Sequence, residues 1–120
     1  MNIQEQFCDS QTSKRLKDIG YNEKCFQLWK GDKLMPLIYH NSMLSLPEES
    51  TAPTWMQAEE FLLNKYNVYI SIQQLVSKKF SAIVASTNQY SFDTILEEFN
   101  CPIMARKEAI RSLIKIKHEK

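Results

Sequence analysis

The 120-residue sequence contains very little glycine, with only Gly20 and Gly31 in the whole chain. Phosphate-binding loops and dinucleotide-binding turns need several glycines close together, so neither can be built here. The Gly-x-Ser-x-Gly motif of a nucleophile elbow is also missing. Only four prolines occur, and so few glycines and prolines argue against long disordered stretches. These absences favour a folded protein that is not an enzyme.

Long apolar runs are missing as well. No segment approaches the roughly 18 consecutive apolar residues of a membrane-spanning helix. The N-terminus carries neither the basic stretch nor the apolar run of a signal peptide. With 15 Lys and Arg against 14 Asp and Glu, the net charge of +1 gives no overall attraction to nucleic acid or acidic membranes. We therefore expect a cytoplasmic protein with no membrane partner, for which nucleic acid is not the main partner.

Metal-binding motifs are absent too. The three cysteines, Cys8, Cys25 and Cys101, are widely spaced, odd in number and form no Cys-x-x-Cys pair. They are typical of free thiols in a reducing compartment. We expect Cys8 to be exposed in an N-terminal arm and Cys25 to be packed in a hairpin. His40 and His118 have no His, Cys or carboxylate at ligand spacing, so the sequence predicts no zinc site and no other cofactor.

The most regular stretch lies in the middle of the chain. Thr54 and Gln57 match a capping box, in which each side chain satisfies a free amide at a helix start. A helix with one apolar face is predicted to follow and to end near Asn67. Residues 68–73 then alternate between apolar and polar, and a second apolar run follows at 80–85. This pattern predicts two antiparallel strands joined by a short turn.

The other elements are predicted from cap residues, turn residues and apolar periodicity. They are a helix at 12–20 capped by Thr12 or Ser13, a hairpin with strands at 25–30 and 33–39 around Gly31-Asp32, a connection at 40–52, a turn at 88–91, a short helix at 92–99 and a last helix from 103 to about 117. The order αββαββαα predicts an α+β fold with a single antiparallel sheet of about four strands and helices packed against it. Residues 1–11 are expected to form a flexible arm, and residues 12–120 a single domain.

Several short structural motifs are shared with a known group of proteins. They are Ser13-x-x-Leu16-Lys17-x-x-Gly20-Tyr21, Ala52-Pro53-Thr54-x-x-Gln57-Ala58, Phe92-Asp93-Thr94 and Glu108-Ala109-Ile110-x-x-Leu113-Ile114. With the strand pair between them, the chain resembles small uncharacterised proteins encoded in bacterial phages and prophages, over roughly residues 13–116. Residues 97–103 look like extra length relative to those proteins. The resemblance implies a fold and a phage or mobile-element context, and it implies no catalytic residues.

The predicted hairpin at 25–39 is apolar on both faces. One face holds Phe26, Leu28, Met35, Leu37 and Tyr39, and the other holds Cys25, Trp29, Leu34, Pro36 and Ile38, interrupted by Gln27. Because an antiparallel sheet with one wet face should show polar residues there, both faces need cover. Two alternatives remain open. Either the first helix and residues 43–46 cover the second face, or Trp29, Leu34 and Ile38 form a docking patch for a protein partner or for a second copy in a homodimer.

The last predicted helix carries a basic face. Lys107, Arg111, Lys115 and His118 follow one another at steps of four, four and three residues. Such a stripe can contact the phosphates of nucleic acid. Cations near a helix C-terminus also compensate the helix dipole, which is the alternative explanation.

We therefore expect a small, non-catalytic, cytoplasmic accessory protein of phage or mobile-element type that acts through protein–protein contacts. The alternative is a weak nucleic-acid-binding protein that uses Lys107, Arg111 and Lys115.

Overall fold

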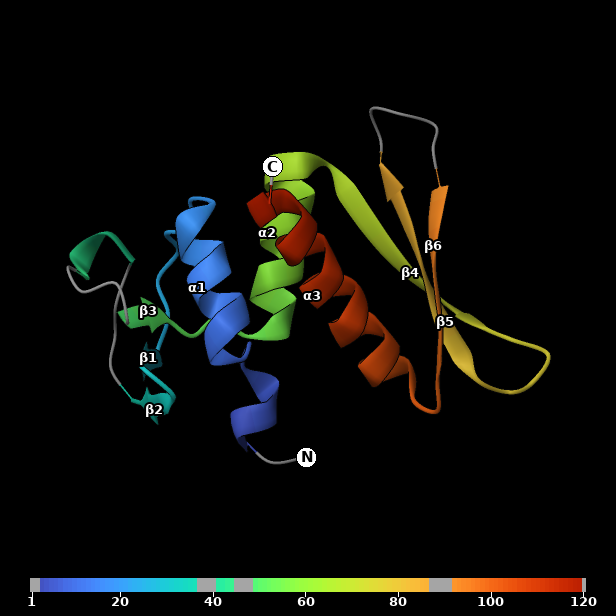
Figure 1. Cartoon of the computed structure of the whole chain (residues 1–120), viewed down its shortest axis with the longest axis horizontal. Coiled ribbons are helices and arrows are strands. Elements are labelled where there is room, and N and C mark those ends of the chain that lie inside the picture. The colour runs from blue at the N-terminus through green and yellow to red at the C-terminus, as the bar shows by residue number, and fades with distance from the viewer. Residues whose placement is uncertain (1–2, 37–40, 45–48, 87–91, 120) are drawn as a thin grey trace. The chain divides into compact units, whose positions relative to one another are not determined.

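The computed structural model of the chain describes residues 3–36, 41–44, 49–86 and 92–119 (Figure 1). These residues form an α+β structure with three α-helices, two short 3-10 helices and two three-stranded antiparallel sheets. The α+β class predicted from the sequence is confirmed, whereas the predicted single sheet of about four strands is wrong. The chain divides into two compact units: unit 1 is Met1–Ala58 with Ile114–Lys120, and unit 2 is Glu59–Leu113.

Unit 1 begins with a 3-10 helix, Ile3–Gln6, and the helix α1, Ser10–Asp18. Asp9 caps α1, because its Oδ1 accepts a hydrogen bond from the N–H of Thr12 at 2.8 Å. The helix was predicted to start at Thr12 or Ser13. It starts earlier because the cap is the aspartate that precedes them.

The predicted end of α1 at Gly20 is confirmed. Gly20 has a φ of +99°, which glycine adopts without a side-chain clash. Its N–H donates to the carbonyl of Lys17 at 3.2 Å, and the N–H of Tyr21 donates to the carbonyl of Leu16 at 2.9 Å. These two bonds are the Schellman pattern, which satisfies the last carbonyls of a helix. Tyr21 is thereby held at a defined place directly after α1.

The residues before α1 are joined to the start of the next long helix. Phe7 forms a β-bridge with Thr54, and the N–H of Cys8 donates to the carbonyl of Pro53 at 2.8 Å. Cys8 is fully buried, so the predicted exposed thiol is wrong at this position. The mixed, polar composition of residues 1–11 indicated an arm, but a pairing with a segment more than 40 residues away holds Cys8 inside.

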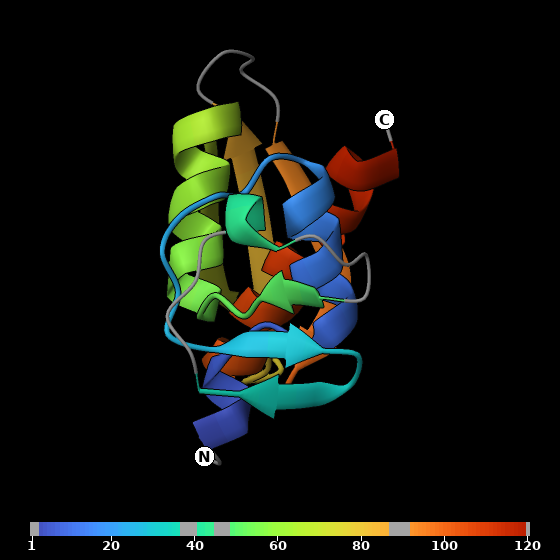
Figure 2. The same ribbon diagram turned by 90° about the vertical axis from the view of Figure 1, so that its left-hand side faces the viewer.

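The sheet of unit 1 has three strands of three residues each, in the order β2-β1-β3 (Figure 2): β1 Leu28–Lys30, β2 Lys33–Met35 and β3 Glu49–Thr51. The β1–β2 hairpin has the predicted register, with Trp29 opposite Leu34. β2 lies at an edge, as Pro36 indicated. β3 lies inside the connection predicted at 40–52, and no apolar alternation marks it because its residues are polar. α1 packs against β3.

The helix α2, Trp55–Tyr66, starts with the predicted capping box. The N–H of Gln57 donates to Thr54 Oγ1 at 3.2 Å, and the N–H of Thr54 donates to Gln57 Oε1 at 2.8 Å. The helix ends before Asn67, whose φ of +56° turns the chain into the following strand. Asparagine is one of the few residues other than glycine that tolerate this conformation.

Unit 2 contains the longer sheet, with β4 Val68–Gln74, β5 Phe80–Ser86 and β6 Phe92–Phe99 in the order β4-β5-β6. β4 and β5 pair over all seven residues of each strand without interruption. Both strands were predicted from their alternation and apolar character. Figure 1 shows α2 and α3 on the same side of this sheet. The alternation along β4 agrees with that placement, because Val68 and Ile70 are buried while Tyr69 and Ser71 are exposed.

The stretch predicted as a helix at 92–99 is the strand β6. It pairs antiparallel with β5, and the register shifts between Phe80 and Ala82 as in a β-bulge. The predicted helix relied on a local cap signal, but Phe92, Thr94 and Ile95 are strand-forming residues and β5 offers them a partner. The turn predicted at 88–91 lies outside the described residues.

The helix α3, Pro102–Glu119, closes the chain. It starts at Pro102, because proline lacks the amide that the first helical position leaves unpaired anyway. Its buried face consists of Ala105, Ala109, Ile110, Leu113 and Ile114. Ile116, near the end of the same helix, is exposed. Within unit 2, Arg106 of α3 forms an ion pair with Glu59 of α2.

Candidate functional site

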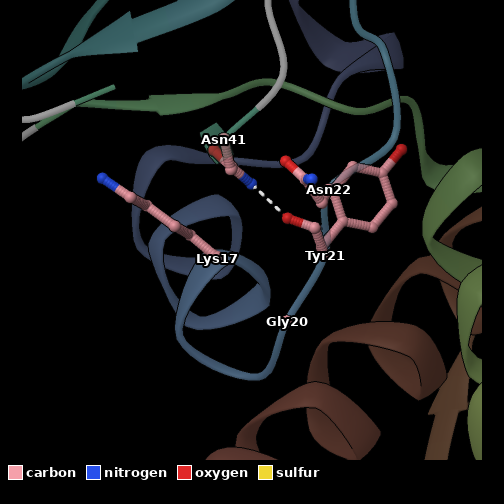
Figure 3. Close-up of a pocket in the computed structure, with 5 residues that line it drawn as sticks. All are labelled: Lys17, Gly20, Tyr21, Asn22 and Asn41. Carbon is pink, nitrogen blue, oxygen red and sulfur yellow. Dashed lines mark hydrogen bonds between the residues drawn. The ribbon is translucent and has the colours of Figure 1, made fainter. Parts of the chain in front are cut away.

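A pocket of about 240 Å³ lies at the C-terminal end of α1, within unit 1 (Figure 3). It is lined by Lys17, Gly20, Tyr21, Asn22 and Asn41. Lys17 belongs to α1, Gly20 to Asn22 belong to the Schellman turn and the residue after it, and Asn41 opens the 3-10 helix Asn41–Met43. The end of α1, the turn after it and the 3-10 helix therefore bring the ammonium group of Lys17 close to the side-chain amides of Asn22 and Asn41.

The polar groups of this pocket hold the chain together. The Nδ2 of Asn41 donates to the carbonyl of Tyr21 at 2.7 Å, and its Oδ1 accepts from the N–H of Thr51 at 2.9 Å. The Nζ of Lys17 donates to the carbonyl of Glu49 at 2.8 Å. Asn41 is buried, so it joins the turn after α1 to β3 through both ends of its amide. The pocket is therefore a product of packing between α1 and β3.

Tyr21 lines the pocket and contacts Cys25, but both are poorly suited to nucleophilic chemistry. The tyrosine hydroxyl and the Cys25 sulfur are 3.7 Å apart and form a buried contact. Burial raises the pKa of the Tyr21 hydroxyl far above its ordinary value of 10.0, and burial also raises the pKa of the Cys25 thiol above 9.0. Both groups are therefore neutral at physiological pH. A reactive cysteine needs a lowered pKa instead.

Two of the three hairpin residues predicted as a docking patch, Trp29 and Leu34, lie in the described part of the chain. Trp29 is only 5% exposed, and its indole N–H donates to the carbonyl of Cys8 at 2.8 Å. Leu34 lies opposite Trp29 and is half-buried. Ile38 lies outside the described residues. A tryptophan covered by its own chain has no face to offer a partner, so a patch centred on Trp29 has lost its main residue.

Both faces of β1 are covered, as its two-sided apolar pattern required. Leu28 and Trp29 are neighbours in the strand and point to opposite faces, and both are buried. Phe26 was predicted to share a covered face with Leu28, but it precedes β1 and is 63% exposed. Cys25 is buried, as predicted.

The predicted basic face of α3 is partly neutralised by carboxylates. Arg111 forms an ion pair with Glu108 one turn earlier in the helix. The Nε2 of His118 lies 2.9 Å from Asp18 Oδ2 in α1. Lys107 is half-buried and Lys115 is exposed. The helix thus brings Lys107, Arg111 and Lys115 onto one face, but the charge of Arg111 is already paired with an acid.

The edge of the longer sheet is a further candidate site, and sequence reasoning missed it. Within the described part of the chain, β4 pairs with β5 on one side only, so it forms one edge of the sheet. Its sequence, Val-Tyr-Ile-Ser-Ile-Gln-Gln, contains no charged residue and no proline. Tyr69, Ser71 and Gln73 are exposed along it. The sequence showed the uncharged strand, but only the strand order shows that it lies at an edge.

The opposite edge of the same sheet differs in both respects. β6 reads Phe-Asp-Thr-Ile-Leu-Glu-Glu-Phe and contains three acidic residues. The β-bulge also lies between β6 and β5, whereas the β4–β5 register is unbroken. Charges and bulges are the devices with which proteins protect edge strands from unwanted pairing. One edge of this sheet carries both devices, and the β4 edge carries neither.

No family model, no curated protein and no solved structure matches the chain. The resemblance to phage-encoded proteins therefore stays a prediction. In the described parts of the chain, no helix is long and apolar enough to cross a membrane. Those parts also hold no group of three His, Cys, Asp or Glu residues that could take up a metal ion. The candidate sites are therefore the β4 edge and the basic face of α3.

Proposed function

We propose that the chain is a non-catalytic accessory protein, of phage or mobile-element type, that acts through protein–protein contacts made by the edge of β4. The observation that carries this proposal is the unprotected edge itself. A seven-residue strand without charge, proline or bulge borders the sheet of unit 2.

The physical basis is the row of backbone groups along such a strand. At a sheet edge, every second residue directs its N–H and C=O away from the sheet, where another strand can pair with them. Addition of a strand to an open edge is a common mode of protein recognition, with the backbone supplying affinity and alternate side chains supplying selectivity. On β4 the exposed side chains available for selectivity are Tyr69, Ser71 and Gln73.

A site-specific photo-cross-linker tests the proposal. A photoreactive phenylalanine replaces Tyr69 in one variant and Met56 in a control. Met56 is 80% exposed, more than the 49% of Tyr69, but it lies on α2, so it is an accessible apolar position away from the β4 edge. After irradiation in the host cell, we expect a defined cross-linked protein band from position 69 and much less from position 56. No cross-link from position 69, or equal cross-linking from both positions, would contradict a contact at this edge.

Nucleic-acid binding through Lys107, Arg111 and Lys115 is the second candidate. The exposed Lys115 and the common helix face support it. It has less support than the β4 edge, because Arg111 is paired with Glu108.

A further inference from the structure

We infer that the occupant of the β4 edge is a second copy of this chain, which pairs β4 with β4 in antiparallel orientation around a two-fold axis at Ser71. This inference rests on the proposed function and names the partner. The product is a dimer with one continuous six-stranded antiparallel sheet, in the order β6-β5-β4-β4-β5-β6.

The alternation of covered and exposed side chains along β4 determines where the two-fold axis can lie. In an antiparallel pair, directly opposite residues lie on the same face of the sheet. The axis must therefore pass through a residue, because an axis between two residues would set buried positions opposite exposed ones. Ser71 is the middle residue of Val68–Gln74, so an axis at this residue uses the whole strand. Any other residue leaves part of β4 without a partner.

The central positions of this register match on both faces. On the covered face it sets Ile70 opposite Ile72, two β-branched residues that pack well across strands, and at the strand ends it sets Val68 opposite Gln74. On the exposed face it sets Tyr69 opposite Gln73, and Ser71 opposite its own copy. Because β4 carries no charge, no like charges meet at any of these positions.

The acidic edge explains why the assembly stops at two copies. A two-fold contact uses the same surface on both chains and closes, whereas a contact between two different edges continues into a fibre. Pairing of β4 with the β6 edge of another copy would meet the exposed Glu98, in a strand whose sequence holds three acidic residues, and a ladder already distorted by the bulge. After β4 has paired with β4, only the two acidic edges remain outside.

Charge-swap variants at Ser71 test the inference. In the wild-type protein, sedimentation equilibrium should give a mass of twice 14.1 kDa, with dissociation in the micromolar range. S71K and S71E each place two like charges directly opposite each other, so each variant alone should dimerise about fivefold more weakly or worse. An equimolar mixture of S71K and S71E should associate at least as well as the wild type, because opposite charges then meet.

Q11K is the control for S71K. It adds the same positive charge on α1, where Gln11 is exposed, and should dimerise like the wild type.

Each outcome decides the question. A monomeric wild type overturns the inference, and so does a dimer that S71K and S71E leave intact. Weakened variants that do not recover on mixing also overturn it, because they exclude a Ser71–Ser71 pair. A monomeric wild type whose position 69 still cross-links to a different protein leaves the proposed function standing and removes only the self-pairing. S71T keeps the strand uncharged and should remain dimeric, which separates the effect of charge from that of substitution.

Discussion

The two sheets of this protein are stabilised in different ways. The sheet of unit 1 has strands of three residues and is stabilised by hydrogen bonds from single side chains. Trp29 donates to the carbonyl of Cys8, and Lys17 donates to the carbonyl of Glu49. Asn41 donates to the carbonyl of Tyr21 and accepts from the N–H of Thr51. The sheet of unit 2 has strands of seven and eight residues and relies on its own backbone ladder. Short strands contribute few ladder bonds, so they need other contacts. Unit 1 should therefore be sensitive to single substitutions that unit 2 tolerates.

The largest effect is expected for Trp29→Ala. It removes a buried indole and one of the two donors to the carbonyl of Cys8, which also accepts from the hydroxyl of Ser13, and should lower the free energy of unfolding by about 3–5 kcal/mol. Tyr69→Ala is the matched aromatic change in unit 2. Since Tyr69 is 49% exposed, we expect a loss below about 1 kcal/mol. Denaturant unfolding followed by circular dichroism measures both, and equal losses would remove the contrast between the sheets.

The next effect is expected for Asn41→Ala. The substitution breaks two buried hydrogen bonds, one to the carbonyl of Tyr21 and one from the N–H of Thr51, at a cost of about 2–3 kcal/mol. Asn64→Ala changes an exposed asparagine of α2 and should alter stability by no more than about 0.5 kcal/mol. If Asn41→Ala were as mild as Asn64→Ala, the amide bridge would not support the short sheet.

Alkaline pH should weaken unit 1. Tyr21 and Cys25 have pKa values raised by burial above 10.0 and 9.0, so the unfolded chain loses these protons first as pH rises. Their contribution to stability is complete below about pH 9 and is then lost, at up to about 1.4 kcal/mol per pH unit for each group. Unfolding of the wild type, Tyr21→Phe and Cys25→Ala between neutral and alkaline pH measures the effect. Both variants should show a flatter decline, and an unchanged slope would contradict the assignment.

The smallest effect is expected on the surface of α3. Replacement of Lys107, Arg111 and Lys115 by Gln should change the free energy of unfolding by less than about 1 kcal/mol, because exposed ion pairs contribute little. The same variant tests nucleic-acid binding. We expect the wild type to bind DNA hardly at all at physiological salt, and any binding at low salt to fall steeply as salt rises. Submicromolar DNA binding by the wild type at physiological salt, if it is lost in the variant, would favour nucleic-acid binding by α3 as the function.

The features predicted correctly from the sequence are those that depend on neighbouring residues. Thr54 and Gln57 form the capping box, Gly20 ends α1 in a Schellman turn, and Gly31-Asp32 sets the β1–β2 register. Each of these is decided within a few residues by backbone conformation or a local hydrogen bond. The long alternating strand β4 was predicted for the same reason.

The features predicted wrongly depend on partners that are distant in the sequence. The polar strand β3 forms because β1 offers it an edge, and β6 is a strand and not a helix because β5 pairs with it. For Trp29 the sequence left two alternatives open, a covered face or a docking patch, and the contact with the carbonyl of Cys8, 21 residues earlier, shows that its indole is covered. Local preference is worth about 1 kcal/mol per residue or less, so a new ladder or a buried contact overrides it.

The sequence by itself determined the start of α2, the glycine that ends α1, the register of the β1–β2 hairpin and the absence of charge on β4. Only the tertiary structure decided that two sheets form in place of one, that Trp29 is inside, and that β4 lies at an edge. Caps and turns are formed by groups already joined by the chain. Strand order and burial depend on which distant segments meet, because a strand has unsatisfied hydrogen-bonding groups on both sides and any suitable neighbour can satisfy them.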